Sequence, residues 1–116
     1  MNYLLENVDY PKEYIYLLEH NFMELKPWKL MEGDWLQTTY EHYNECFPDE
    51  FLVPFAVKLD WGVIAFFDLS PTGDYEIIIL HDESLGSWER REKFATLWSW
   101  FKRVSDDFID FAINDL

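Results

Sequence analysis

The stretch FLVPFAVKLDWGVIAFFDLSPTGDYEIIILHD, from Phe51 to Asp82, decides the fold of this 116-residue chain. It contains two apolar runs of strand length, Trp61–Phe67 and Tyr75–Leu80, in which both alternating sets of residues are apolar. Such runs are typical of strands whose two faces are both covered. The link between them, Ser70–Asp74, is turn material, and so short a link implies an antiparallel hairpin. The stretch therefore predicts the centre of an antiparallel sheet with helices or long loops on each face.

Two helices are expected before this hairpin. Pro11 occupies a favoured first helical position, and a helix is predicted from there to about His20. Asp34 followed by Gln37 has the form of a capping box with aspartate, and predicts a second helix over Trp35–Cys46. The apolar stripe of this second helix recurs at helical spacing and consists of Leu36, Tyr40, Tyr43 and Phe47.

Two segments that contain proline are predicted to be strands. Leu25–Met31 is predicted as a short strand in which Pro27 marks the start or an edge of the sheet. Phe51–Val57 is predicted as an edge strand or a bent approach to the sheet, because Pro54 lies inside it. Both predictions follow from the missing N–H group of proline, which cannot donate to a strand ladder.

The C-terminal segment has the strongest helical periodicity. Its apolar residues recur at spacings of three and four through about five turns, and they are Phe94, Leu97, Trp98, Phe101, Val104, Phe108 and Phe111. We expect this stripe to pack on the sheet. Basic residues come early in this segment and acidic residues late, which opposes the helix dipole at the C-terminal end. The late acids either form an ordinary solvated face or serve something besides stability.

Composition limits the class of protein. With no Pro-, Gly- or Ser-rich linker, residues 1–116 are expected to form a single domain. Cys46 is the only cysteine, so an internal disulfide is excluded. The first residues lack a signal-peptide pattern and no apolar run reaches about 18 residues. A cytoplasmic protein is therefore expected.

The strong acidity of the chain bears on its partners. Against 23 acidic residues there are 9 basic ones, and the formal net charge of −14 repels nucleic-acid phosphates. Direct binding of DNA or RNA is therefore not expected. The excess of acids serves either solubility or the steering of a basic partner.

Short motifs along the chain resemble those of the SUKH superfamily in their order and spacing. They are Leu52-Val53-Pro54-Phe55-Ala56, Ala65-Phe66-Phe67-Asp68, Ile79-Leu80-His81-Asp82, and Phe94 with Trp98 and Trp100, preceded by Pro11-Lys12-Glu13-Tyr14 and Leu25-Lys26-Pro27-Trp28. The resemblance covers Pro11 to Ala112. It implies an α+β single domain with a mostly antiparallel central sheet, helices packed around it and a long C-terminal aromatic helix.

The same resemblance implies an immunity protein, which binds and neutralises a toxin effector that one bacterium delivers to another. The effector is often a nuclease, and an acidic inhibitor fits a basic nuclease. Distant members of the superfamily are eukaryotic regulatory proteins, including yeast cell-wall assembly regulators. No turnover, cofactor or metal is needed for occlusion, so no enzyme activity is expected, and the chain itself is expected to be a monomer or weak homodimer.

Candidate contact residues follow from this hypothesis of occlusion. The acidic candidates are Glu41, Glu45, Asp49, Glu50, Asp74 and Glu83, and the aromatic candidates are Tyr43 and Trp88. For each acid the alternative is an ordinary solvated side chain. Tyr43 also fits the core, because it lies on the stripe of the second helix, and Trp88 fits either the core or an interface.

Two other classes of function stay open. A small hydrolase would use Asp68 with His81 and Asp82, although a structural or loop-capping role is the alternative for these residues. His42 and Cys46 are one helical turn apart, but two ligands do not make a zinc site. A general interaction module or assembly subunit would instead present a broad apolar patch, and the candidates for it are Trp61, Trp88 and Trp100.

Overall fold

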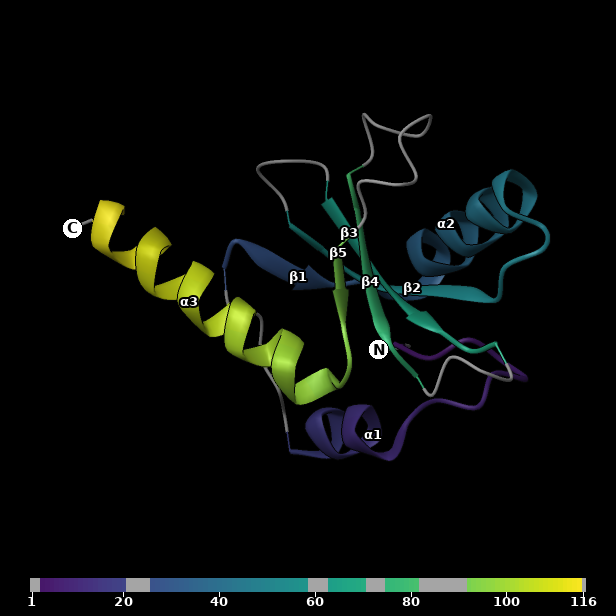
Figure 1. Cartoon of the computed structure of the whole chain (residues 1–116), viewed down its shortest axis with the longest axis horizontal. Coiled ribbons are helices and arrows are strands. Elements are labelled where there is room, and N and C mark those ends of the chain that lie inside the picture. The colour runs from purple at the N-terminus through teal and green to yellow at the C-terminus, as the bar shows by residue number, and fades with distance from the viewer. Residues whose placement is uncertain (1–2, 21–25, 59–62, 71–74, 82–91, 116) are drawn as a thin grey trace.

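The computed structural model describes residues 3–20, 26–58, 63–70, 75–81 and 92–115. Its elements in chain order are α1 (Lys12–Glu19), β1 (Trp28–Leu30), α2 (Gly33–Cys46), β2 (Leu52–Lys58), β3 (Val63–Asp68), β4 (Ile77–His81), β5 (Glu92–Phe94) and α3 (Leu97–Asp115). The five strands form one antiparallel sheet in the order β1-β2-β3-β4-β5 (Figure 1). The expected α+β architecture is therefore confirmed, and the helix predicted from Pro11 is α1.

Strands β3 and β4 form the predicted central hairpin. Their register pairs Val63 with His81 at one end and Phe67 with Ile77 at the other. Every residue in 63–67 and in 77–80 is buried. Both faces of this hairpin are covered, as the continuous apolar runs predict.

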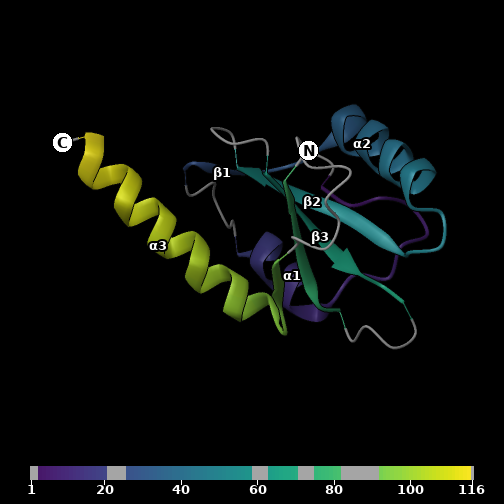
Figure 2. The same cartoon turned by 45° about the horizontal axis from the view of Figure 1, so that its top comes forward.

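Helices cover both faces of the sheet (Figures 1 and 2). On one face lies α2, where Tyr43 packs edge-on against Phe66 with ring centroids 5.0 Å apart. On the other face, the ring of Phe55 contacts Tyr14 of α1 and Trp100 of α3. The core is therefore a sheet with an aromatic layer on each side.

Strand β2 lies inside the sheet, so the edge position that Pro54 indicated is wrong. Strand β1 is one of the two edge strands, which agrees with one of the two roles predicted for Pro27, and it pairs only with the Ala56–Lys58 end of β2. Pro54 lies outside that pairing, where its missing N–H group leaves no gap in the ladder with β1. The register between β2 and β3 shifts between Pro54 and Ala56. Strand β2 is therefore irregular at its proline, whereas the alternative prediction, a bent approach to the sheet, stays a prediction.

The start of α2 differs from the predicted capping box at Asp34. The helix begins at Gly33, and the side chain of the N-cap residue, Glu32, makes no capping hydrogen bond. Gly33 has a φ of 60°, which glycine adopts without strain. Gln37 donates from Nε2 to Glu41 Oε2 at 3.2 Å and does not cap the helix. Asp34 lies in the first turn, where its negative charge interacts favourably with the positive end of the helix dipole.

The C-terminal helix begins later than predicted, and only part of its predicted stripe is buried. Phe94 belongs to β5, which pairs with β4. The residues of α3 that are buried are Leu97, Trp100 and Val104, whereas Trp98, Phe108 and Phe111 are 46%, 40% and 37% exposed. The C-terminal half of α3 extends beyond the sheet (Figure 1), so its apolar residues have no sheet to pack on.

Asp107 attaches α3 to the β1–β2 end of the sheet. Its Oδ2 accepts a hydrogen bond from Trp28 Nε1 at 2.8 Å and lies 3.5 Å from Lys58 Nζ. Its Oδ1 lies 3.7 Å from Arg103 Nε. The side chain of Asp107 is only 14% exposed, so solvent screens these contacts less than it screens a surface ion pair. This late acid of α3 therefore has a structural role.

The hydroxyl group of Tyr14 is buried, and it has no hydrogen-bond partner among the described residues. We expect Tyr14→Phe to raise the free energy of unfolding by about 1 kcal/mol, because the ring contacts stay and an unsatisfied polar group is removed. Urea unfolding of the two proteins at neutral pH measures this difference. A less stable Tyr14→Phe protein would show that the hydroxyl group is bonded.

The same hydroxyl group makes stability fall in alkali. Burial raises the pKa of Tyr14, and the neighbouring Tyr10 raises it further. The contribution of the neutral Tyr14 phenol to the free energy of unfolding is fully present below the unfolded-state pKa of about 10. It is lost progressively as the pH rises above that value. At pH 11 this loss is about 1.4 kcal/mol, because tyrosine ionises in the unfolded chain only. Tyr14→Phe should therefore lose less stability between about pH 9 and 11 than the unchanged protein.

Candidate functional site

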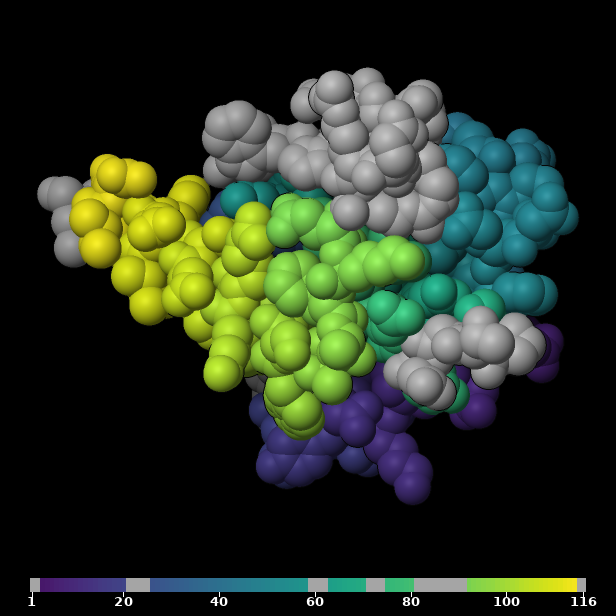
Figure 3. Space-filling model, viewed as in Figure 1, coloured from purple at the N-terminus to yellow at the C-terminus, as the bar shows by residue number. Residues whose placement is uncertain are grey.

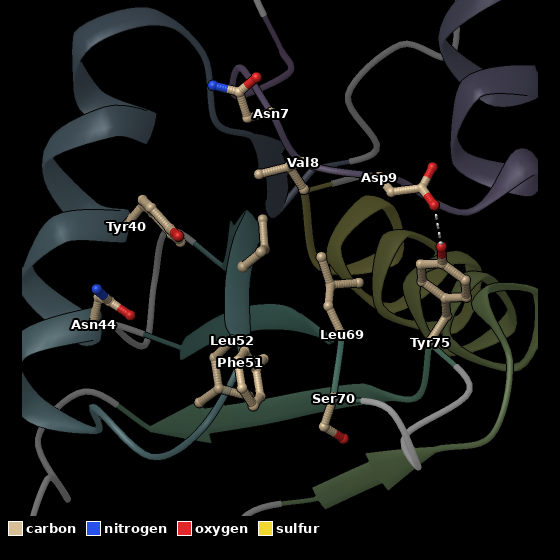
Figure 4. Close-up of a pocket in the computed structure, with 11 residues that line it drawn as sticks. Asn7, Val8, Asp9, Tyr40, Asn44, Phe51, Leu52, Leu69, Ser70 and Tyr75 are labelled. Atoms are coloured by element: carbon tan, nitrogen blue, oxygen red, sulfur yellow. Dashed lines mark hydrogen bonds between the residues drawn. The ribbon is translucent and has the colours of Figure 1, made fainter.

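An open cavity of about 460 Å³ lies between the N-terminal segment, α2 and the ends of β2 and β3 that face them (Figure 4). Its apolar lining consists of Val8, Phe51, Leu52, Val53 and Leu69. Its polar lining consists of Asn7, Asp9, Tyr40, Asn44, Ser70 and Tyr75. The cavity thus combines an apolar wall with several hydrogen-bonding groups, as binding sites commonly do.

Ordinary features of the fold position this lining. Tyr40 and Asn44 are four residues apart on α2, so they lie on one side of the helix, one turn from each other. The N–H group of Leu69 donates to the carbonyl oxygen of Phe51 at 2.8 Å, which holds the chain after β3 against the chain before β2. The wall of the cavity is therefore fixed by a helix and by backbone hydrogen bonding.

Two lining residues have left-handed backbone conformations. Asn7 has a φ of 62° and Tyr75 a φ of 59°. Asparagine tolerates this region, but a bulky aromatic residue there is strained. The hydroxyl group of Tyr75 donates to Asp9 Oδ2 at 3.4 Å (Figure 4). Burial raises the pKa of Tyr75 and the Asp9 carboxylate raises it further, so Tyr75 remains a neutral donor at physiological pH. Backbone strain of this kind concentrates at functional sites.

Four of the predicted acids lie beside this cavity along the chain. Glu41 and Glu45 are exposed, and each directly follows a cavity-lining residue of α2. Asp49 is exposed and Glu50 is half-buried in the turn that precedes Phe51. We call Glu41, Glu45, Asp49 and Glu50 the acidic rim. None of the four acids lines the cavity itself, but each lies within two residues of a lining residue in the sequence, and the lining contains one further carboxylate, that of Asp9.

The aromatic residue that the site exposes is Phe51, which is 57% exposed. Phe51 was predicted to lie in a strand and was not among the predicted contact residues. Tyr43, which was among them, is only 2% exposed and packs against Phe66. The alternative of a core role for Tyr43 is confirmed, so it is not an anchor on the surface of the free protein.

The other predicted contact residues do not enter this site. Asp74, Glu83 and Trp88 lie outside the described residues, as does Trp61. Trp100, a candidate for an exposed apolar patch, is 1% exposed and belongs to the core. The prediction of an exposed apolar patch that includes Trp100 is therefore wrong.

The register of the central hairpin separates the residues of the hydrolase hypothesis. His81 pairs with Val63, whereas Asp68 lies at the opposite end of β3. Five residues of strand span roughly 16 Å, so Asp68 and His81 do not share a site. Asp68 Oδ1 instead accepts a hydrogen bond from the N–H group of Ser70 at 3.0 Å. Its predicted loop-capping role is confirmed.

The His42 and Cys46 side chains on α2 are close but form no larger cluster. Cys46 Sγ lies 3.8 Å from His42 Nε2, as their spacing of one helical turn allows. Within the described ranges, no group of three or more His, Cys, Asp or Glu residues could hold a metal ion. This pair therefore provides fewer ligands than a protein zinc site needs.

The arrangement suits a cationic side chain of a protein partner. The Asp9 carboxylate and the neighbouring phenol and amide oxygens can accept hydrogen bonds from a guanidinium or ammonium group. The apolar wall can cover the methylene stem of the same side chain. The acidic rim attracts such a partner from a greater distance.

Comparisons of the chain with protein-family models, with curated proteins and with solved structures find no match. In the part of the chain that the structure describes, no helix has both the length and the apolar character needed to cross a bilayer. The function proposed for this chain therefore rests on its own residues and their arrangement.

Proposed function

We propose that this protein is an immunity protein, which binds a basic bacterial toxin effector and neutralises it in a one-to-one complex. The observation that carries the proposal is the position of the acidic rim beside an open cavity with an exposed aromatic residue, Phe51. Complementary charge steers two proteins together and fixes their register, and aromatic residues at the centre supply much of the binding energy. The resemblance of the chain to the SUKH superfamily supports the same function.

Occlusion is the mechanism. A nuclease binds the phosphates of its substrate in a groove lined by lysine and arginine. The carboxylates of the acidic rim take the place of those phosphates, and a cationic side chain of the toxin enters the cavity beside Asp9. The inhibitor acts by blocking access, so it needs no turnover and no cofactor. It acts in the cytoplasm, where the substrate of such a toxin lies.

A general interaction module is the second candidate. Four apolar residues in the C-terminal half of α3 are exposed, namely Phe108, Ile109, Phe111 and Ile113. Exposed apolar surface of this kind marks sites of protein association. Toxin activity distinguishes the two candidates, because only an immunity protein abolishes it.

Calorimetric titration of the toxin domain encoded immediately upstream tests the proposal. We expect one inhibitor per toxin. Raising the salt concentration from about 0.05 M to 0.5 M should raise the Kd about tenfold or more, because screening weakens the attraction between opposite charges. An unrelated basic protein of similar size is the control and should not bind. A toxin that does not bind at low salt, or that binds no better than this control, contradicts the proposal.

A further inference from the structure

A second open cavity continues the first one along α2. It has a volume of about 350 Å³ and lies between the N-terminal segment and the first half of α2. Its lining consists of Leu4, Leu5, Glu6, Asn7, Gly33, Leu36, Gln37 and Tyr40. Asn7 and Tyr40 also line the first cavity, so the two cavities meet at this pair of residues. We call the two cavities together the α2 groove.

One face of α2 forms a long wall of the α2 groove. The lining residues on this helix are Gly33, Leu36, Gln37, Tyr40 and Asn44, whose spacing is that of one helix face. From Gly33 to Asn44 the helix rises about 16 Å. Figure 4 shows Tyr40 and Asn44 on this wall, with Asn7 on the facing segment. Both walls reach the surface at the end of the molecule opposite to the C-terminus of α3 (Figure 3).

The dimensions of the α2 groove fit an extended peptide. The two cavities together enclose roughly 800 Å³ over about 16 Å, which gives a mean cross-section of about 50 Å². A β-strand occupies about the same area, because neighbouring strands lie about 4.8 Å apart and packed sheets about 10 Å apart. A helix with its side chains is about 10–12 Å wide and needs roughly twice that area. The length of the groove corresponds to about five extended residues.

Amide side chains along the α2 groove suit a peptide backbone. Asn7, Gln37 and Asn44 each carry an amide group that donates and accepts, as the N–H and C=O groups of a peptide do. Asn7 and Asn44 are exposed, and their side chains make no hydrogen bond within the described residues. These two amides are therefore available to a backbone that lies in the groove.

The charge of the α2 groove favours a basic occupant. The lining contains the carboxylates of Glu6 and Asp9, one in each cavity, and none of the described residues that line it is a lysine or an arginine. Glu41 and Glu45 of the acidic rim directly follow lining residues of α2. A nucleic-acid strand, which is also an extended polymer, is repelled by these carboxylates. A neutral or acidic peptide would leave them without a cationic partner.

We propose that the α2 groove binds an extended, basic segment of the toxin that is about five residues long. One cationic side chain of this segment lies beside Asp9 and another beside Glu6, while the amides of Asn7 and Asn44 bond its backbone. This inference rests on the proposed function, and it specifies which kind of toxin segment the site takes.

Gln37→Trp tests whether the segment runs through the second cavity. The indole takes up space that the segment needs, so the Kd for the toxin domain encoded immediately upstream should rise at least about tenfold. Thr38→Trp is the matched control, because it adds the same side chain at the next position of α2, which is exposed and does not line the groove. The control should change the Kd less than about threefold.

The outcomes of this test separate the inference from the proposed function. If both variants bind the toxin as tightly as the unchanged chain does, the second cavity is not used. The inference is then overturned, whereas the complex of the unchanged chain still supports the proposed function. A toxin domain that does not bind the unchanged chain overturns both.

Cross-linking tests the extended conformation of the bound segment. A photoreactive side chain replaces Gln37 in one preparation and Asn44 in another, and mass spectrometry locates the toxin residues that become attached. These positions lie about 10 Å apart along α2, a distance that about three extended residues or about seven helical residues span. We expect two attachments about three residues apart in one toxin segment that contains lysine or arginine. Attachments about seven residues apart, or in two separate segments, overturn the inference.

Discussion

Phe55→Ala should lower the free energy of unfolding by about 3–5 kcal/mol, the largest loss of stability that we expect from a single substitution. Phe55 is completely buried. It stacks on Phe67 with ring centroids 4.0 Å apart, and its ring lies 5.4 Å from Tyr14 and 4.9 Å from Trp100. Alanine would leave a cavity where α1, α3 and the sheet meet. The loss is a large fraction of the 5–15 kcal/mol, roughly, that stabilises an ordinary domain.

Urea unfolding followed by tryptophan fluorescence measures this loss. Phe51→Ala is the matched control, because it removes the same side chain from a position four residues earlier that is 57% exposed. We expect the control to change stability by less than about 0.5 kcal/mol. A loss below about 1 kcal/mol for Phe55→Ala, or equal losses in the two variants, would show that Phe55 is not central to the core.

Glu41→Lys together with Glu45→Lys should weaken toxin binding about 100-fold, which corresponds to about 2.7 kcal/mol. Both side chains are exposed on α2 beside the cavity. The double substitution replaces attraction to a basic toxin with repulsion, and it leaves toxin cations that were paired in the complex without partners. Slower association and faster dissociation should both contribute.

Surface plasmon resonance with immobilised toxin measures both rates. The matched control is Asp106→Lys together with Asp110→Lys, which makes the same change in net charge at two exposed positions one turn apart on α3. The control should weaken binding only slightly, through the long-range field. Equal weakening by the two pairs would mean that net charge alone governs binding, and no weakening by the α2 pair would exclude the acidic rim from the interface.

The elements with strong local patterns were predicted from the sequence. The β3–β4 hairpin follows from two continuous apolar runs and a short turn, and α2 from a regular stripe that includes Leu36 and Tyr43. The position of β2 could not be predicted, because a proline inside a strand indicates an edge, whereas here Pro54 lies at a register shift with β3 and beyond the part of β2 that pairs with β1.

The start of α3 was missed for a similar reason. β5 contains three residues, too few for alternation to be recognised, and Phe94 has the spacing of the helical stripe that follows it. The helix start is marked by Thr96, whose Oγ1 accepts a hydrogen bond from the N–H group of Ser99 at 3.1 Å. That capping signal was present in the sequence but weaker than the apolar periodicity.

The acids of the site were predictable and its cavity was not. Glu41 and Glu45 are prominent in an acidic chain, and they follow the lining residues directly. The cavity itself needs segments far apart in the chain, since the hydrogen bond of Tyr75 to Asp9 spans 66 residues. The exposure of Phe51 likewise depends on where the turn after α2 meets the sheet, which is a property of the folded chain.

Co-expression of this chain with the toxin domain encoded immediately upstream tests the proposed function most directly. The toxin domain alone should kill the cells. With this chain present, we expect the cells to survive and the two proteins to copurify in equal amounts. Death of the cells while both proteins accumulate without forming a complex would contradict neutralisation by occlusion.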